Sequence, residues 1–153
     1  MNDPPAMRVV RCRTVAQGRF RQLNYIRDLP PAQPMTDVEA DNLLGDDVSA
    51  SALEGLLAAL GSCLAMGIHA TAVARRIPIR RLELELEADI SSAAWGSIGP
   101  EPAAVGFEAV RVSVQLDAEA THENLAALVN HATLWPPVAN TLHNPMHLDV
   151  HLQ

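Results

Sequence analysis

Apolar and polar residues alternate along several stretches of the chain, which predicts β-strands with one buried and one solvent-facing side. Residues 7–28 alternate in two halves, Met7 to Val15 and Phe20 to Arg27, on either side of a turn at Gln17-Gly18. This arrangement predicts a β-hairpin. The same alternation returns in three later stretches and predicts three further strands, at 81–90, 107–116 and 146–152.

A long apolar stretch between the hairpin and the later strands predicts a helix from Ser51 to about Arg76. Ser51 followed by Glu54 three residues later has the pattern of a capping box, which satisfies the first free N–H groups of a helix. Arg75 and Arg76 suit the negative C-terminal end of the helix dipole. Pro78 then forces the helix to stop.

Two shorter helices are expected near the C-terminus. The first begins at Thr121 and runs to about Trp135, and the second covers 138–143 after the break at Pro136-Pro137. The segments 29–47 and 91–105 read as irregular loops, of which 29–47 has room for a short strand. The order of elements, with strands on both sides of a central helix, predicts an α+β fold in a single domain spanning residues 1–153.

The twenty residues from Gly55 to Ala74 carry no formal charge and are long enough to cross a bilayer. A helix that is apolar on all sides is more often the centre of a soluble core or of an obligate dimer. We therefore expect no membrane span and a homodimer.

Composition narrows the range of functions. The net charge is −7 and all eleven basic residues are Arg, so the chain lacks the basic face that nucleic-acid binding requires. Only two Phe, two Trp and one Tyr are present, so the core must be aliphatic. The N-terminus has no basic segment followed by an apolar run, and we expect a cytoplasmic protein.

Cys63 is the candidate for chemistry, because it lies within the apolar helix directly after two small residues, Gly61 and Ser62. The small residues would let another surface approach closely. A free thiol ionises only near pH ~8.5, so a reactive Cys63 needs a positive charge beside it. The alternative is that Cys63 is a small buried apolar residue. The same alternative applies to Cys12, the second cysteine, on the first predicted strand.

The histidines do not suggest a metal site. His143 and His147 stand on either side of Pro145, and His147 and His151 would lie too far apart along a strand to share an ion easily. No cluster of histidines and carboxylates has a recognised ligand spacing. We expect neither a metal nor another cofactor.

Three segments, in this order, resemble the OsmC/Ohr family of bacterial peroxide-handling proteins: Glu54 to Cys63, Pro78 to Glu85, and Pro137 to Leu142. The resemblance covers nearly the whole chain. It implies an intertwined homodimer with two β-sheets around central helices, and two active sites at the subunit interface. It also implies that one cysteine thiolate attacks a hydroperoxide, becomes a sulfenic acid, and condenses with a second cysteine.

The chain departs from the family at the second cysteine, where Pro136 stands in its place. The intramolecular disulfide cannot form there, and Cys12 is a possible replacement. The resemblance assigns the attacking thiol to Cys63 and the orienting carboxylate to Glu54. It leaves two candidates for the arginine over the thiolate, Arg19 in the hairpin turn and Arg27 at the end of the second strand.

A capping box alone would also account for Glu54. Nine helical steps separate Glu54 from Cys63 and rotate it to the opposite face, so Glu54 would serve a partner's site unless the helix bends at Gly55. Trp135 would either form a wall of the pocket or anchor the helix end.

We therefore expect a peroxidase that reduces organic hydroperoxides or related electrophiles through Cys63 in oxidative-stress defence, with an external thiol completing the cycle. The alternative is a non-catalytic dimer of the same fold that binds a small apolar ligand in the same pocket.

Overall fold

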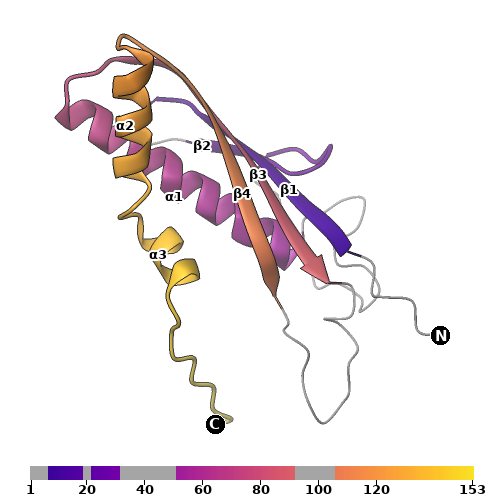
Figure 1. Ribbon diagram of the computed structural model, residues 1–153. Coiled ribbons are helices and arrows are strands. Elements are labelled where there is room, and N and C mark those ends of the chain that lie inside the picture. Colours follow the sequence, from indigo (N-terminus) through magenta and orange to yellow (C-terminus); the bar gives the residue numbers. More distant parts are fainter. Residues whose placement is uncertain (1–6, 19–21, 32–50, 92–105) are drawn as a thin grey trace.

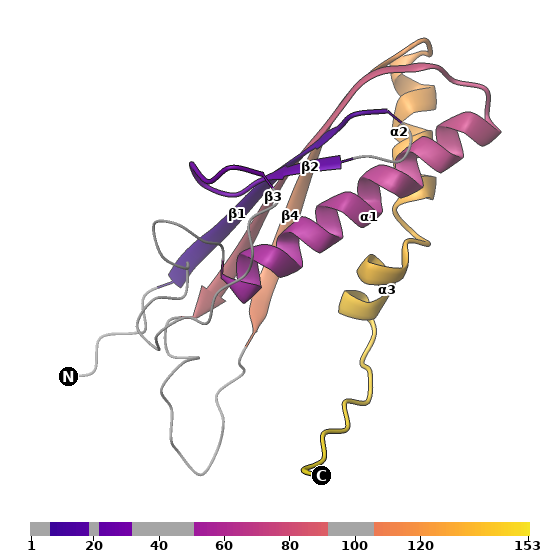
Figure 2. The same ribbon diagram turned by 180° about the vertical axis from the view of Figure 1, so that it is seen from behind.

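The computed structural model describes residues 7–18, 22–31, 51–91 and 106–153. A four-stranded antiparallel sheet carries a long helix across one face, and two shorter helices flank that helix (Figures 1 and 2). The elements in chain order are β1 (Met7–Ala16), β2 (Gln22–Tyr25), α1 (Ala52–Ala74), β3 (Ile79–Ser91), β4 (Phe107–Ala118), α2 (His122–Ala132) and α3 (Pro137–His143). The expected α+β class is confirmed.

The sheet has the strand order β2-β1-β3-β4. β1 and β2 form the predicted hairpin, in which Arg13 lies opposite Tyr25 and Ala16 opposite Gln22. Gly18 in the connecting turn has a φ of 84°, a conformation that glycine adopts without strain. β2 is shorter than predicted and lies at one edge of the sheet, and β4 lies at the other edge.

The two faces of the sheet follow the alternation in the sequence. On β3, the inward residues Leu82, Leu84 and Leu86 are buried. The outward residues of the same strand form cross-strand ion pairs, Glu87 with Arg11 and Asp89 with Arg111. Exposed pairs of this kind add little stability. The burial of the aliphatic face against α1 therefore holds the layers together.

α1 begins with the predicted capping box. The Ser51 hydroxyl accepts from the Glu54 N–H at 3.2 Å, and the Glu54 carboxylate accepts from the Ser51 N–H at 2.8 Å. The helix is long and apolar enough to cross a membrane by length and composition. Its buried residues, which include Leu57, Leu64 and Ile68, belong instead to the core beneath the sheet. α1 is thus the core helix of this fold.

α2 and α3 follow the sequence prediction with one change. The Thr121 hydroxyl caps α2 by accepting from the Asn124 N–H at 3.3 Å. α2 ends at Ala132 rather than near Trp135. Pro136 disfavours helical geometry in Trp135, the residue before it, and the Leu134 N–H donates to the His131 carbonyl in a tighter turn after the helix. The chain then turns, and α3 begins at Pro137 as its first helical residue.

The prediction of a last strand at 146–152 is wrong for the single chain, because residues 144–153 contain no helix or strand. Its alternating apolar side chains are all exposed, from 67% for Met146 to 102% for Leu152. A strand needs a neighbour to pair with, and the described part of this chain provides none for it. Most of the expected loop strand in 29–47, and the loop 91–105, lie outside the described residues.

Candidate functional site

Cys63 lies on the side of α1 that meets the connection between α2 and α3. It is half-buried and lines an open pocket of about 350 Å³ together with Met66, Gly67, Ala132, Trp135 and Pro136, among others. Trp135 therefore forms a wall of this pocket, as one of the two alternatives predicted. Its ring is largely exposed, at 71%. We call this cavity the Cys63 pocket.

The Cys63 pocket is apolar. The described residues that line it include no charged side chain. A thiolate needs a cation or a set of hydrogen-bond donors close by to form at neutral pH. Within the described part of one chain, the pocket walls do not supply such a charge.

Pro136 lies at the Cys63 pocket, where the resemblance places the second family cysteine. It packs on α1 one turn beyond Cys63: a Cβ added at Gly67 would lie 3.0 Å from the Pro136 Cγ and 2.9 Å from the Ala132 carbonyl oxygen. Gly67 thus allows the α2–α3 connection to approach the helix. The position is near Cys63 in space, and its occupant has no thiol.

Arg27, one of the two candidate arginines, forms an ion pair with Glu54. The Arg27 Nε donates to Glu54 Oε1 at 2.6 Å, and Nη2 donates to Oε2 at 3.3 Å. The Glu54 side chain is 1% exposed and the Arg27 side chain 32%. A two-pronged pair of this kind fixes the guanidinium in both position and plane. Glu54 thus both caps α1 and pairs with an arginine.

Arg27 sits in a strained turn. Its φ is 50°, in the left-handed region that residues with a Cβ rarely adopt. The Leu29 N–H closes the turn by donating to the Ile26 carbonyl at 3.1 Å. A strained backbone conformation persists only where the surrounding contacts hold the residue in place. Such residues are concentrated at functional sites.

The chain does not bring this pair to its own Cys63. Nine residues of a regular helix rotate by two and a half turns and advance by about 13 Å. Glu54 is buried against the sheet side of α1, and Cys63 opens to the α2–α3 side. α1 runs as one continuous helix through Gly55. Arg19, the other candidate, lies outside the described residues.

Cys12 occupies a different environment. It is 4% exposed in the core between β1 and α1. Burial raises the pKa of its thiol to about 11, the nearby Glu54 carboxylate adds to that rise, and a hydrogen bond with Thr14 opposes it. Cys12 is not among the residues that line the Cys63 pocket. Its surroundings are those of a protonated, inert core thiol.

A chain of polar side chains next to Cys63 was not predicted. The Thr14 hydroxyl donates to Asn24 Oδ1 at 2.7 Å, and Asn24 Nδ2 donates to Ser62 Oγ at 2.8 Å. A Cβ at Gly61 would overlap the Thr14 hydroxyl, so this glycine is the small residue that admits β1. The available signal was Thr14 itself, a polar residue at an inward position of an alternating strand.

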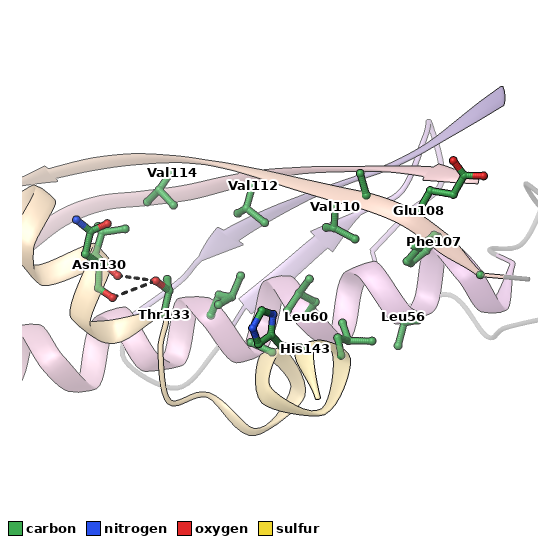
Figure 3. Close-up of a pocket in the computed structure, with 16 residues that line it drawn as sticks. Leu56, Leu60, Phe107, Glu108, Val110, Val112, Val114, Asn130, Thr133 and His143 are labelled. Carbon is green, nitrogen blue, oxygen red and sulfur yellow. Dashed lines mark hydrogen bonds between the residues drawn. The ribbon is translucent and has the colours of Figure 1, made fainter. Parts of the chain in front are cut away.

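A second, larger cavity separates β4 from α1 and α3. Figure 3 shows Val110, Val112 and Val114 of β4 facing Leu56 and Leu60 of α1, and His143 of α3 also lines the cavity. The cavity measures about 830 Å³ and is mainly aliphatic. We call it the β4 groove. The β4 groove lies where α1 and the β4 edge of the sheet leave the space between them open.

Comparison with known proteins decides the family. The family model for OsmC-like proteins matches residues 45–151, more than half of the chain. The chain belongs to the OsmC-like protein family. No curated protein matches it at a significant level.

Two solved structures share the OsmC-like fold of this chain. An OsmC-like hydroperoxide resistance protein from Jannaschia sp. CCS1 matches with a TM-score of 0.70 at 20% identity, over 97% of this chain and 94% of that one. An OsmC-like protein from Mycoplasma pneumoniae matches with a TM-score of 0.53 at 17% identity, over 94% and 89%. At these identities the likeness concerns the fold alone.

Within the described ranges, no group of three or more His, Cys, Asp or Glu side chains is placed to hold a metal ion. The described residues offer a thiol, an apolar pocket and a separately held arginine–carboxylate pair.

Proposed function

We propose that this OsmC-like protein reduces organic hydroperoxides or related electrophiles through the single thiol of Cys63, as a cytoplasmic defence against oxidative stress. The observation that carries the proposal is the placement of a half-buried cysteine in an open apolar pocket on the helix of an OsmC-like fold. An apolar pocket suits the organic part of a hydroperoxide. The similar structure from Jannaschia sp. CCS1 is that of an OsmC-like hydroperoxide resistance protein, which agrees with this assignment.

The reaction balances with one cysteine and an external thiol. The Cys63 thiolate attacks the terminal oxygen of the hydroperoxide, the O–O bond breaks, and the alkoxide leaves and takes up a proton. Cys63 is then a sulfenic acid. One external thiol condenses with it to a mixed disulfide and releases water. A second external thiol attacks that disulfide and frees Cys63, and the two external thiols leave joined to each other by a disulfide. Because Pro136 has no thiol, no partner at that position competes with the external one.

We propose that Arg27 and Glu54 act on the Cys63 of a second copy in a homodimer. The Cys63 pocket lacks a charged wall among its described residues, and the pair faces away from it on the same helix. A second copy would bring the two together. The guanidinium would favour the thiolate and hydrogen-bond the departing oxygen, and Glu54 would hold its orientation. Arg19 is the alternative source of this charge.

The homodimer is supported by unpaired apolar surface. The side chains of Leu148 and Val150 are 75% and 81% exposed in the C-terminal segment. β4 is an edge strand of the sheet and one wall of the β4 groove. We propose that residues 146–152 of a second copy pair along β4 and cover the groove, which would give the predicted strand its missing neighbour.

Sedimentation velocity tests the dimer. Leu148→Asp with Val150→Asp should give a monomer or an unfolded chain at micromolar concentration, because both changes place charge in the buried side of the added strand. His147→Asp with His151→Asp is the matched control, since it adds the same charges on the alternate side. A folded dimer in both double variants would show that this segment does not hold the copies together.

The enzyme proposal is tested by hydroperoxide consumption with a dithiol reductant. Cys63→Ser should abolish turnover of cumene hydroperoxide, and Cys12→Ser should leave it within about twofold, because the core thiol stays protonated. Equal turnover in wild type and Cys63→Ser would remove Cys63 from the mechanism.

The second candidate function is a dimer that binds a small apolar ligand without chemistry, with Cys63 only lining the site. The absence of a thiol at Pro136 and the apolar lining of the Cys63 pocket favour it. The rate of Cys63 alkylation against pH separates the two. Reaction as a thiolate at neutral pH favours the enzyme, and a thiol inert below pH 9 favours the ligand-binding protein.

A further inference from the structure

A buried contact that joins β1, β2 and α1 contains polar groups, whereas the rest of the core is aliphatic. Thr14 is 0% exposed, and its hydroxyl is connected through the Asn24 amide to the Ser62 hydroxyl. The Asn24 side chain uses its oxygen as acceptor and its nitrogen as donor, one toward each neighbour. Apolar residues of the same size would fill this space, but they would not fix the direction or register of β2.

The same contact requires a glycine on α1. A Cβ at Gly61 would overlap the Thr14 hydroxyl and lie 3.0 Å from the Leu86 Cδ1. One turn of α1 therefore makes three different contacts on three of its sides, through Gly61, Ser62 and Cys63. Gly61 admits β1, Ser62 accepts the hydrogen bond from β2, and Cys63 faces its pocket.

β2 needs such an anchor because it is short and lies at the edge of the sheet. It has four residues and pairs only with β1. Two side chains tie this segment to α1, Asn24 at Ser62 and Arg27 at Glu54. Eight helical residues span about 12 Å, and three residues of extended chain span about 10 Å. The two anchors thus lay the segment 24–27 along the helix, toward its N-terminus.

The anchor at Asn24 bears directly on Arg27. Two residues separate them, and Arg27 has the strained φ of 50°. If the strand before it moved, the turn could relax to an ordinary backbone conformation and carry the guanidinium away from Glu54. A site needs such support behind the residues that act, because a small displacement of a charged group weakens its effect on the reacting atom.

We propose that Asn24 is a positioning residue of the Cys63 site, which keeps the Arg27 turn against Glu54 through its hydrogen bond to Ser62. This inference rests on the proposed function, in which Arg27 favours the Cys63 thiolate of a second copy. It assigns a role to a side chain that touches neither the thiol nor its pocket.

The test is the pH profile of Cys63 alkylation by iodoacetamide, read on the Cys63 peptide by mass spectrometry in the full-length protein. Arg27→Met should move the midpoint of the profile upward by about one pH unit, the size expected for loss of a neighbouring charge. Asn24→Leu, which is nearly isosteric, and Ser62→Ala should each move it upward by about half a unit, because the guanidinium is displaced rather than removed.

Two comparisons distinguish positioning from a loss of stability. Thr121→Ala removes the α2 cap and should lower the melting temperature without moving the midpoint. In the Arg27→Met background, Asn24→Leu should cause no further shift, because its effect passes through Arg27.

The outcomes separate the two proposals. If Arg27→Met moves the midpoint and Asn24→Leu does not, the positioning role is overturned and the role of Arg27 stands. The positioning role is also overturned if Asn24→Leu causes an equal shift without Arg27. If Arg27→Met itself leaves the profile unchanged, the proposed role of Arg27 fails and that of Asn24 fails with it.

Discussion

Arg27 and Glu54 are joined by a 2.6 Å hydrogen bond although 27 positions separate them in the chain. The bond ties the turn after β2 to the first turn of α1, and the same carboxylate accepts from the Ser51 N–H at 2.8 Å. One buried glutamate therefore both caps the core helix and holds Arg27, one of the two arginines that the family resemblance offers as the partner of a reactive thiol. Glu54 lies on the face of α1 opposite Cys63. Whether the pair acts on a reactive thiol therefore depends on how two copies assemble.

Loss of one partner of this pair should cost more stability than loss of both. Arg27→Met leaves a buried carboxylate with one N–H donor, and we expect a loss of about 2 kcal/mol, less than for a fully buried pair because Arg27 is 32% exposed. Arg27→Met with Glu54→Leu should be more stable than Arg27→Met alone. Urea denaturation of the two variants and of Glu54→Leu measures this. Additive losses would show that the two side chains do not depend on each other.

Gly61→Ala should destabilise the protein more than most helix substitutions, although alanine normally favours a helix. The added methyl would overlap the Thr14 hydroxyl and crowd the Leu86 Cδ1 at 3.0 Å. We expect a loss of about 2 kcal/mol in thermal or urea unfolding, within the range for an overpacked core. Thr14→Ala should recover part of that loss when combined with Gly61→Ala. A stabilising Gly61→Ala would contradict the close approach of β1 to α1.

Cys12 should titrate only in strongly alkaline solution. Burial raises its pKa to about 11 in the folded protein, from 9.0 in an exposed thiol. The protonated thiol thus stabilises the fold fully below pH 9, and this contribution is lost as the pH rises toward 11. Between these values the free energy of unfolding should fall in wild type by on the order of 2 kcal/mol more than in Cys12→Val.

Alkylation provides the second measurement on Cys12. At pH 8.5, iodoacetamide should modify Cys63 in the folded protein and reach Cys12 only after denaturation. Fast modification of Cys12 under native conditions would show that the β1–α1 core opens.

Oxidation by one equivalent of hydroperoxide should leave Cys63 as a sulfenic acid that dimedone traps, and excess oxidant should carry it to the sulfinic acid. The reason is that Pro136 lies at the Cys63 pocket and Cys12 does not. Intact mass spectrometry should show the gain of one and then two oxygens. A loss of two hydrogens with a Cys12–Cys63 linked peptide would show that Cys12 resolves the oxidised thiol after all.

Much of the fold could be predicted from the sequence because its signals are local. The capping box at Ser51 and Glu54, the alternation along β3 and the glycine turn at Gly18 each determine structure within a few residues. The end of α2 was placed three residues too late, since an apolar pattern continues to Trp135 although Pro136 ends the helix earlier. The strand at 146–152 was predicted from alternation alone, and alternation does not say which chain supplies its neighbour.

The site was less predictable, because it depends on contacts between distant segments. The resemblance named both Arg19 and Arg27; the pairing of Arg27 with Glu54 became visible only in the folded structure, and Arg19 lies outside the described residues. The role of Asn24 had no local signal, since an asparagine in a short strand is unremarkable until its partners are known. Gly61 was correctly predicted to admit a close surface, but the identity of that surface, Thr14, required the fold.

The central claim is that Arg27 of one copy acts on Cys63 of the other, and a heterodimer tests it most directly. Co-expressed Cys63→Ser and Arg27→Met chains, each with its own tag, are purified as the mixed dimer by two affinity steps. One of its two sites then combines an intact Cys63 with an intact Arg27 from the other chain, and we expect about half of the wild-type hydroperoxide turnover. Turnover no higher than that of the Arg27→Met homodimer would contradict the account.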